Sequence, residues 1–176
     1  VIDADTGRTL LEDNADRQIY PASLTKMMTL YLLFGALDRG TVKLDQPLPV
    51  SAHAASMPAT KLGLMPGDAL PVELAIHAII IQSANDAASV VAEALGGSED
   101  AFADMMNAQA QRLGMRSTSF RNASGLPNPL QKTTARDLTI LARALVQTYP
   151  GYYHYFSDDS FVWRSRTYVG HNRLLR

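Results

Sequence analysis

An apolar run from about Ser23 to Leu37 constrains the fold more than any other feature of this sequence. Apolar side chains recur at almost every helical position of the run, so they cover nearly every side of a helix: Leu24, Met27, Met28, Leu30, Leu32, Leu33 and Phe34. A helix that is apolar all round is normally buried in a protein core. We therefore predict a helix over residues 23–37 that is buried on all sides.

A second apolar helix is predicted to begin at Pro71, in the segment PVELAIHAIIIQ. Proline suits the first turn of a helix, and the acidic Glu73 complements the positive end of the helix dipole. The SAND segment at residues 83–86 interrupts this helix, with Asp86 as the expected N-cap of the next one. The helical pattern then resumes to about Leu95 and ends at two glycines.

Two further helices have recognisable starts. Ser98 is a good N-cap for a helix that ends near Gly114. Thr134 and Asp137 match a capping box that begins a helix to about Gln147. The proline- and asparagine-rich segment between these helices is predicted to be a loop.

Strands are predicted at both ends of the chain. VIDADTGRTLLED is typical of two short strands joined by a turn, and FVWRSRTYV alternates as one strand near residues 161–169. This order indicates a helical region, residues 23–147, inserted between strands of one sheet. The whole chain, residues 1–176, is expected to be a single incomplete domain, because it stops soon after the sheet resumes.

Composition excludes several classes of protein. The net charge is −1 and there is no basic stripe, so nucleic acid binding has little support. No apolar run approaches the length of a membrane span, and no signal peptide is present. Cysteine is absent, and the four histidines lack metal-ligand spacing, so no metal site is expected.

Ser23 and Lys26 are the strongest candidate catalytic pair. Residues three apart on a helix share a face, with Cβ atoms roughly 5–6 Å apart, so Lys26 can reach the Ser23 hydroxyl. Serine becomes nucleophilic when a base takes its proton, and a buried lysine with a lowered pKa can be that base. At a helix start the backbone N–H of Ser23 is also a candidate oxyanion donor. The alternative is a chance S-x-x-K at a helix start.

Ser83 and Asn85 are the second candidate element, at the point where an apolar helix breaks. In the functional interpretation, Ser83 relays a proton near Lys26 and Asn85 binds a substrate amide. In the structural interpretation, the segment is only a turn between two helices. S-x-x-K followed by S-x-N is far more specific than either motif alone. The sequence has no G-x-S-x-G, so a Ser–His–Asp hydrolase is unsupported.

Five segments together carry a resemblance to a known family: PASLTKMMT, SANDAA, FRNASGLPNP, TTARDLTILARAL and HNRLLR. They resemble the serine D-alanyl-D-alanine carboxypeptidases, the low-molecular-mass penicillin-binding proteins of bacteria, along essentially the whole chain. The resemblance implies an α+β fold, the β-lactamase/DD-peptidase (penicilloyl-serine transferase) fold. In that fold an antiparallel sheet is flanked by helices and joined to a mostly helical subdomain. The C-terminal strands of the sheet would be missing from this chain.

The resemblance also implies an activity. Ser23 would attack the carbonyl of the penultimate D-Ala in a peptidoglycan stem peptide, the terminal D-Ala would leave, and water would hydrolyse the acyl-enzyme. Lys26 and Ser83 would be catalytic, and Asn85 would bind substrate. Penicillins and other β-lactam antibiotics would acylate the same serine, and no cofactor would be needed.

The resemblance further implies a location outside the cytoplasmic membrane. The family acts typically in the periplasm, after secretion by a signal peptide that this chain lacks. Many members carry a C-terminal domain and an amphipathic membrane anchor. Membrane association would therefore come only through parts absent from this chain.

One departure from the family pattern leaves alternatives open. The later K-T-G motif is absent, and the nearest string, QKTTA at residues 131–135, precedes a helix. We therefore expect the natural protein to continue past Arg176. A D,D-endopeptidase that cuts peptidoglycan cross-links would use the same residues, and a non-catalytic penicillin-binding-like fragment is the other alternative. A class A β-lactamase is disfavoured, because residues 120–134 hold no acidic side chain for deacylation.

Overall fold

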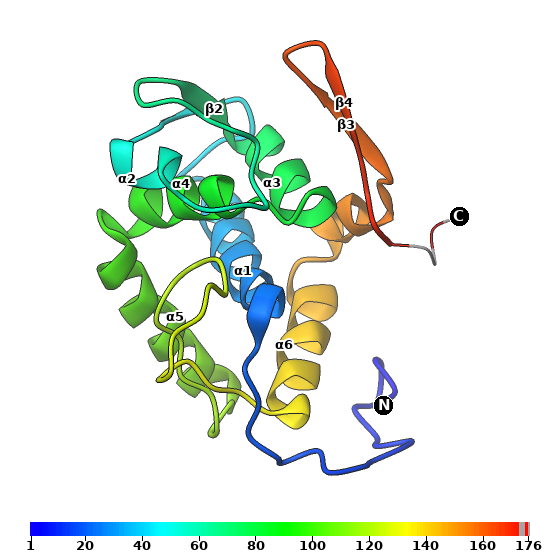
Figure 1. The fold of residues 1–176 in the computed structure, drawn as a ribbon. Coiled ribbons are helices and arrows are strands. Elements are labelled where there is room, and N and C mark those ends of the chain that lie inside the picture. The colour runs from blue at the N-terminus through cyan, green and yellow to red at the C-terminus, as the bar shows by residue number, and fades with distance from the viewer. Residues whose placement is uncertain (173–174, 176) are drawn as a thin grey trace.

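The computed structural model describes residues 1–172 and 175. Helices dominate the described chain, where η marks a 3₁₀ helix, and the strands form two separate two-stranded antiparallel sheets. The elements are η1 (Ala22–Thr25), α1 (Lys26–Asp38), β1 (Pro47–Pro49), α2 (Ala52–Ala55), β2 (Ala69–Pro71), α3 (Val72–Ile81), α4 (Asn85–Gly96), α5 (Glu99–Leu113), α6 (Ala135–Thr148), η2 (Pro150–Ser157), β3 (Ser160–Trp163) and β4 (Arg166–Val169). Figure 1 shows α1 in the middle of the molecule, between α5 and α6.

Helix α1 is the centre of the core, and its predicted burial is confirmed along most of its length. It contacts α4, α5 and α6, and its Met28, Leu33 and Phe34 are fully buried. Burying a side chain of this size contributes about 1.5–3 kcal/mol, so α1 holds the surrounding helices together. Leu24 differs, because it is 50% exposed and lies in the 3₁₀ turn that precedes α1.

Three of the predicted helix starts are also confirmed. Helix α3 begins after Pro71, and the Ser98 hydroxyl accepts the Ala101 N–H at 3.1 Å at the start of α5. The Thr134 hydroxyl accepts the Asp137 N–H at 3.1 Å at the start of α6. Side chains that cap orphan N–H groups therefore begin two of these helices.

The reciprocal half of the capping box at α6 is not formed. The Asp137 carboxylate instead accepts the Ser117 N–H at 2.9 Å and the Thr118 hydroxyl at 2.6 Å. This carboxylate therefore ties the segment after α5 to the start of α6.

The prediction of two N-terminal strands was wrong. The segment has one isolated bridge, Ile2 with Thr9, around its turn. The Arg143 guanidinium of α6 donates to the carbonyls of Ala4 and Asp5, both at 2.8 Å. A few backbone hydrogen bonds also cross the turn, but within the described chain they do not extend into a ladder, and the Arg143 contacts hold the segment against α6.

The prediction of one strand over residues 161–169 was also wrong, because this segment is a hairpin. Strand β3 pairs antiparallel with β4, with Ser160 opposite Val169 and Trp163 opposite Arg166. Arg164 and Ser165 turn the chain with φ of 48° and 63°. A two-residue hairpin turn of type I′ needs positive φ at both positions, which Asn-Gly signals in a sequence and Arg-Ser does not.

Candidate active site

Ser23 lies in η1, directly before the buried helix α1. The residue before it, Ala22, has a left-handed φ of 48°. A Cβ placed on Gly125 would lie 1.8 Å from the Ala22 carbonyl oxygen, so only glycine permits this approach. The exposed Ser23 is thus carried on a strained turn that rests on the 122–125 loop.

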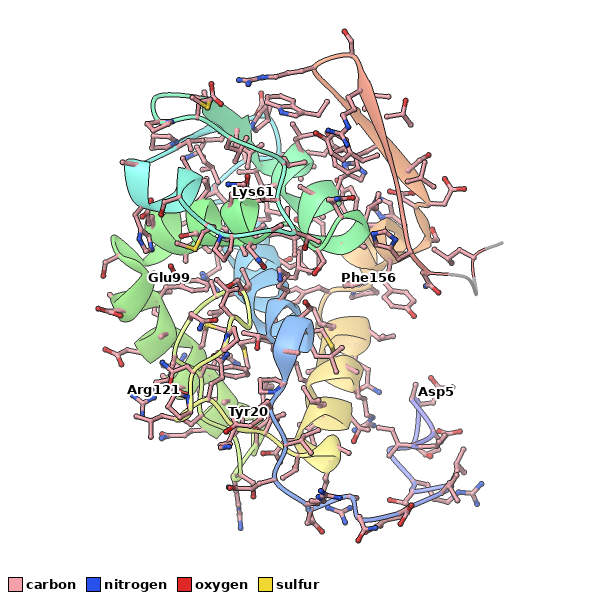
Figure 2. All side chains as sticks on the ribbon, viewed as in Figure 1. Asp5, Tyr20, Lys61, Glu99, Arg121 and Phe156 are labelled. Atoms are coloured by element: carbon pink, nitrogen blue, oxygen red, sulfur yellow. The ribbon has the colours of Figure 1, made fainter. Side chains whose placement is uncertain are left out.

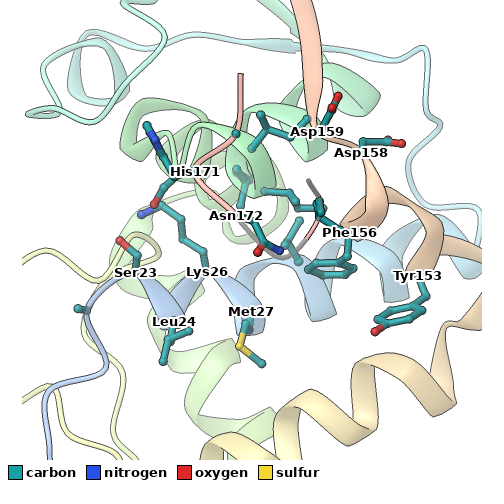
Figure 3. A pocket seen from close by; sticks show the side chains of 18 of the residues that line it. Ser23, Leu24, Lys26, Met27, Tyr153, Phe156, Asp158, Asp159, His171 and Asn172 are labelled. Atoms are coloured by element: carbon teal, nitrogen blue, oxygen red, sulfur yellow. The ribbon is translucent and has the colours of Figure 1, made fainter. Parts of the chain in front are cut away.

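Lys26 reaches the same side of η1 as Ser23, as Figure 3 shows, and both line a cavity of about 730 Å³. Lys26 is only 3% exposed. Burial disfavours its charged form and lowers the pKa of Lys26 from 10.5 to about 8. A neutral amine, the form that can accept a proton, is therefore accessible near neutral pH.

Two acceptors orient the Lys26 amine. Its Nζ donates to Asn85 Oδ1 at 2.8 Å and to the Ser124 carbonyl at 2.7 Å. A neutral amine has two N–H bonds and one lone pair. With both N–H bonds engaged by these acceptors, the lone pair is left to accept a proton.

Ser83 stands at the sharp break between α3 and α4, with a left-handed φ of 55°. It lines the same cavity as Ser23 and Lys26. Within residues 1–172 and 175, its Oγ is one of two buried side-chain atoms without a hydrogen-bond partner, the other being Thr25 Oγ1. A strained residue with an unsatisfied buried hydroxyl is costly, and such residues concentrate at functional sites.

Asn85 is the first residue of α4 and joins three segments. Its Oδ1 accepts from Lys26, and its Nδ2 donates to the Pro58 carbonyl at 3.0 Å. A carboxamide has two acceptor lone pairs and two N–H donors. One acceptor position and one donor position thus remain beyond these contacts, which matches what binding of a substrate amide requires.

Asp86 is not the N-cap that its position predicts, because the cap position is Ala84. Its buried carboxylate accepts the backbone N–H groups of Leu62, Gly63 and Leu64 at 3.0, 2.9 and 3.1 Å. Asp86 therefore holds the loop that follows Pro58 against the start of α4, beside Asn85.

Ser23 also lines a second, smaller cavity. It measures about 290 Å³ and is lined by two loops, with Ala59 and Thr60 on one side and Leu126 and Pro127 on the other. Its lining has no charged side chain, whereas Asp158, Asp159 and His171 line the larger cavity. Ser23 thus lines both cavities, and of the two only the larger has carboxylate side chains in its otherwise largely apolar lining.

Sequence reasoning missed the 122–125 loop as part of the site. The Ser124 carbonyl accepts from Lys26, and Gly125 allows the contact with Ala22. The string NASG in the sequence was the available signal, since glycine after short polar residues indicates a turn.

The described residues contain neither a metal site nor a membrane-spanning helix. They hold no group of three or more His, Cys, Asp or Glu side chains placed to bind a metal ion. Among residues 1–172 and 175, no helix has the length and apolar character needed to cross a membrane.

A serine and a buried lysine at a helix start, joined by Asn85 from a second helix, invite comparison with known proteins. The family model of the D-alanyl-D-alanine carboxypeptidases matches residues 1–176. This chain belongs to that family.

Relatives within this family are similar over nearly all of the chain. D-alanyl-D-alanine carboxypeptidase DacF of Bacillus subtilis is 36% identical over 185 residues, which cover 100% of this chain and 46% of that protein. DacC of Escherichia coli is 36% identical over 181 residues, covering 99% of this chain and 45% of that protein. The chain therefore spans about half the length of the curated relatives that it matches.

Solved structures confirm the predicted fold class. Penicillin binding protein 6B of Escherichia coli superposes with a TM-score of 0.93 at 33% identity, over 99% of this chain and 57% of that one. Penicillin binding protein 5 of Haemophilus influenzae gives a TM-score of 0.94 at 30% identity, over 99% and 52%. The chain has the DD-peptidase fold over the part that it spans.

Proposed function

We propose that this chain carries the nucleophile and base of a serine-type D-alanyl-D-alanine carboxypeptidase, within one catalytic domain. The observation that carries the proposal is the arrangement of Lys26, whose two acceptors direct its amine while burial keeps its pKa near 8. Family membership and the identity to DacF and DacC support it.

In the proposed reaction, the neutral Lys26 takes the Ser23 proton as Oγ bonds to the carbonyl carbon of the penultimate D-Ala. The Ser23 N–H, at the start of the helix, faces the developing oxyanion. The C–N bond to the terminal D-Ala then breaks, and its nitrogen takes a proton that Ser83 relays from Lys26. Water finally cleaves the acyl ester, with Lys26 again as the base.

The substrate class follows from the family. We propose a peptidoglycan stem peptide that ends in D-Ala-D-Ala, with its penultimate amide bound by Asn85. β-Lactam antibiotics would acylate the same serine, and a relative of known structure, Penicillin-Binding Protein D2 of Listeria monocytogenes, was solved in its ampicillin-bound form. The site of action would be the periplasm or another extracytoplasmic space.

A D,D-endopeptidase is the second candidate. The D-alanyl-D-alanine endopeptidase of Pseudomonas aeruginosa is 32% identical over 85% of this chain and 47% of that protein. The two activities differ in what leaves, a free D-Ala or a cross-linked stem. Release of D-Ala from a pentapeptide and cleavage of a purified cross-linked dimer separate them.

The experiment that tests the proposal compares the full-length protein with its Ser23→Ala variant. The wild type is expected to release D-Ala from a diacetyl-Lys-D-Ala-D-Ala peptide and to be acylated by benzylpenicillin. The variant is expected to do neither, because the nucleophile is absent. D-Ala release that persists in the variant would contradict the proposal.

A further inference from the structure

The loop that orients Lys26 is itself held from two sides. Its residue Ala123 is fixed at both polar groups of its peptide units: the carbonyl accepts the Thr29 hydroxyl at 2.7 Å, and the N–H donates to Glu99 Oε1 at 3.1 Å. Thr29 belongs to α1 and lies one turn after Lys26, whereas Glu99 is the first residue of α5. The loop is thus suspended between the central helix and the start of α5.

Besides the Ala123 N–H, the Glu99 carboxylate contacts two further side chains. Its Oε2 accepts the Ser89 hydroxyl at 3.1 Å and contacts His53 Nε2 at 2.7 Å. The Glu99 side chain is 12% exposed, so these contacts are partly shielded from water. Figure 2 labels Glu99 on α5, a helix that carries none of the proposed catalytic residues.

We propose that Glu99 is a positioning residue for the lysine base, an inference that rests on the proposed function. By holding the Ala123 N–H, Glu99 fixes the adjacent Ser124 carbonyl, which accepts from Lys26 at 2.7 Å. If this carbonyl turned away, one Lys26 N–H would lose its acceptor, and the direction of the amine's lone pair would no longer be fixed. Glu99 touches no reacting atom and acts only through the loop.

Glu99 is also an acidic residue in the first turn of α5, so its charge could act on the helix dipole alone. Two substitutions separate the effect of its side-chain length from the effect of its charge. Glu99→Gln keeps the length and an acceptor oxygen for the Ala123 N–H but removes the charge. Glu99→Asp keeps the charge at the helix start but withdraws the oxygen by one methylene. A residue that serves only the helix dipole would tolerate Asp and suffer from Gln. A residue that positions the loop shows the opposite order.

The experiment measures benzylpenicillin acylation of the full-length protein by stopped flow, with the binding constant of the initial complex and the first-order acylation rate obtained separately. We expect Glu99→Asp and Glu99→Ala to slow the first-order rate by about 10- to 100-fold, since small misplacements of a reacting group cost up to about 10²-fold. Initial binding stays within about twofold, and Glu99→Gln stays close to wild type. Glu93→Ala is the matched control. Glu93 lines a surface cavity together with Glu99, but its carboxylate accepts from the Ser51 hydroxyl, which lies outside the 122–125 loop.

The outcomes separate this inference from the proposed function. If benzylpenicillin does not acylate the wild type, the proposed function itself is contradicted. If the wild type is acylated, two results would overturn the inference about Glu99 and leave the proposed function standing. One is an acylation rate for Glu99→Asp equal to that of Glu93→Ala, and the other is a slower rate for Glu99→Gln than for Glu99→Asp. Should Glu99→Ala fail to fold, the order of Glu99→Asp and Glu99→Gln still decides.

Discussion

Ser98 and Ser23 both stand at helix starts, and their surroundings differ in almost every respect. Ser98 has extended backbone angles, and its hydroxyl caps the Ala101 N–H. Ser23 lies inside a 3₁₀ turn after the left-handed Ala22, and no side-chain cap closes the start of that turn. The hydroxyl of Ser98 stabilises its helix, whereas that of Ser23 faces the cavity it shares with Lys26.

The residues that follow the two serines carry opposite charge types: acidic after Ser98 and basic after Ser23. Glu99 and Asp100 follow Ser98 and complement the helix dipole. Ser23 is followed by a buried lysine at the start of α1, where a positive charge is unfavourable for both solvation and the dipole. The comparison shows that the start of α1 is less stable than that of α5, because it holds a buried lysine near the positive end of the helix dipole. The same environment lowers the pKa of Lys26, so a neutral amine is available in the cavity that Ser23 also lines.

Replacement of Lys26, the buried lysine at the start of α1, is expected to have the largest effect on acylation. Lys26→Met should slow acylation by benzylpenicillin about 10²–10⁴-fold, the usual contribution of a general base, while initial binding changes little. The exposed Lys43 provides a control in Lys43→Met, which should acylate at the wild-type rate. Equal acylation rates in the two variants would remove Lys26 from the mechanism.

The pH profile sharpens the same point. Because burial lowers the pKa of Lys26 to about 8, its neutral, reactive form increases as the pH rises toward 8. The acylation rate should therefore rise nearly tenfold per unit at pH 6–7 and level off above about pH 8.5. A rate that does not change between pH 6 and 9 would show that no group with this pKa controls acylation.

Gly125→Ala tests the strained turn that carries Ser23. A methyl group there would meet the Ala22 carbonyl, and Gly125 has a φ of +87°. We expect a loss of about 1–3 kcal/mol in the free energy of unfolding by urea, together with slower acylation. Gly40→Ala is the matched control, since Gly40 has a φ of +69° but nothing within 4 Å of its added Cβ. If both variants acylate equally well, the contact between Gly125 and Ala22 is not needed for the site.

Ser98→Ala is expected to have the smallest effect. Loss of an N-cap costs about 1 kcal/mol, which urea unfolding can detect, and acylation should remain at the wild-type rate. A fall in acylation comparable with that of Lys26→Met would mean that the two helix starts are not separate in function.

Much of the helical framework could be predicted from the sequence, because its punctuation is local. Pro71, Ser98 and Thr134 mark helix starts through their own geometry or hydrogen bonds. The hairpin of β3 and β4 could not be predicted as such, because alternation continues through a two-residue turn and Arg164–Ser165 carries no turn signal. The register of β3 with β4 leaves only these two residues for the turn, and both have positive φ.

The candidate site was predictable only as far as side chains define it. Spacing pointed to Ser23, Lys26, Ser83 and Asn85, and the fold brings Lys26 into contact with Asn85 across α1 and α4. The second acceptor of Lys26 is a backbone carbonyl, that of Ser124, which any residue could supply. Its place depends on Glu99 and Thr29, and no motif connects these residues to the serine.

The most direct test of the account is the intact mass of the full-length protein after incubation with benzylpenicillin, followed by peptide mapping of the adduct. The account predicts one penicilloyl group per molecule, on the peptide that contains Ser23, and slow formation of that adduct in Lys26→Met. An adduct on any other serine, or a protein that remains unmodified, would contradict the assignment of Ser23 and Lys26 as nucleophile and base.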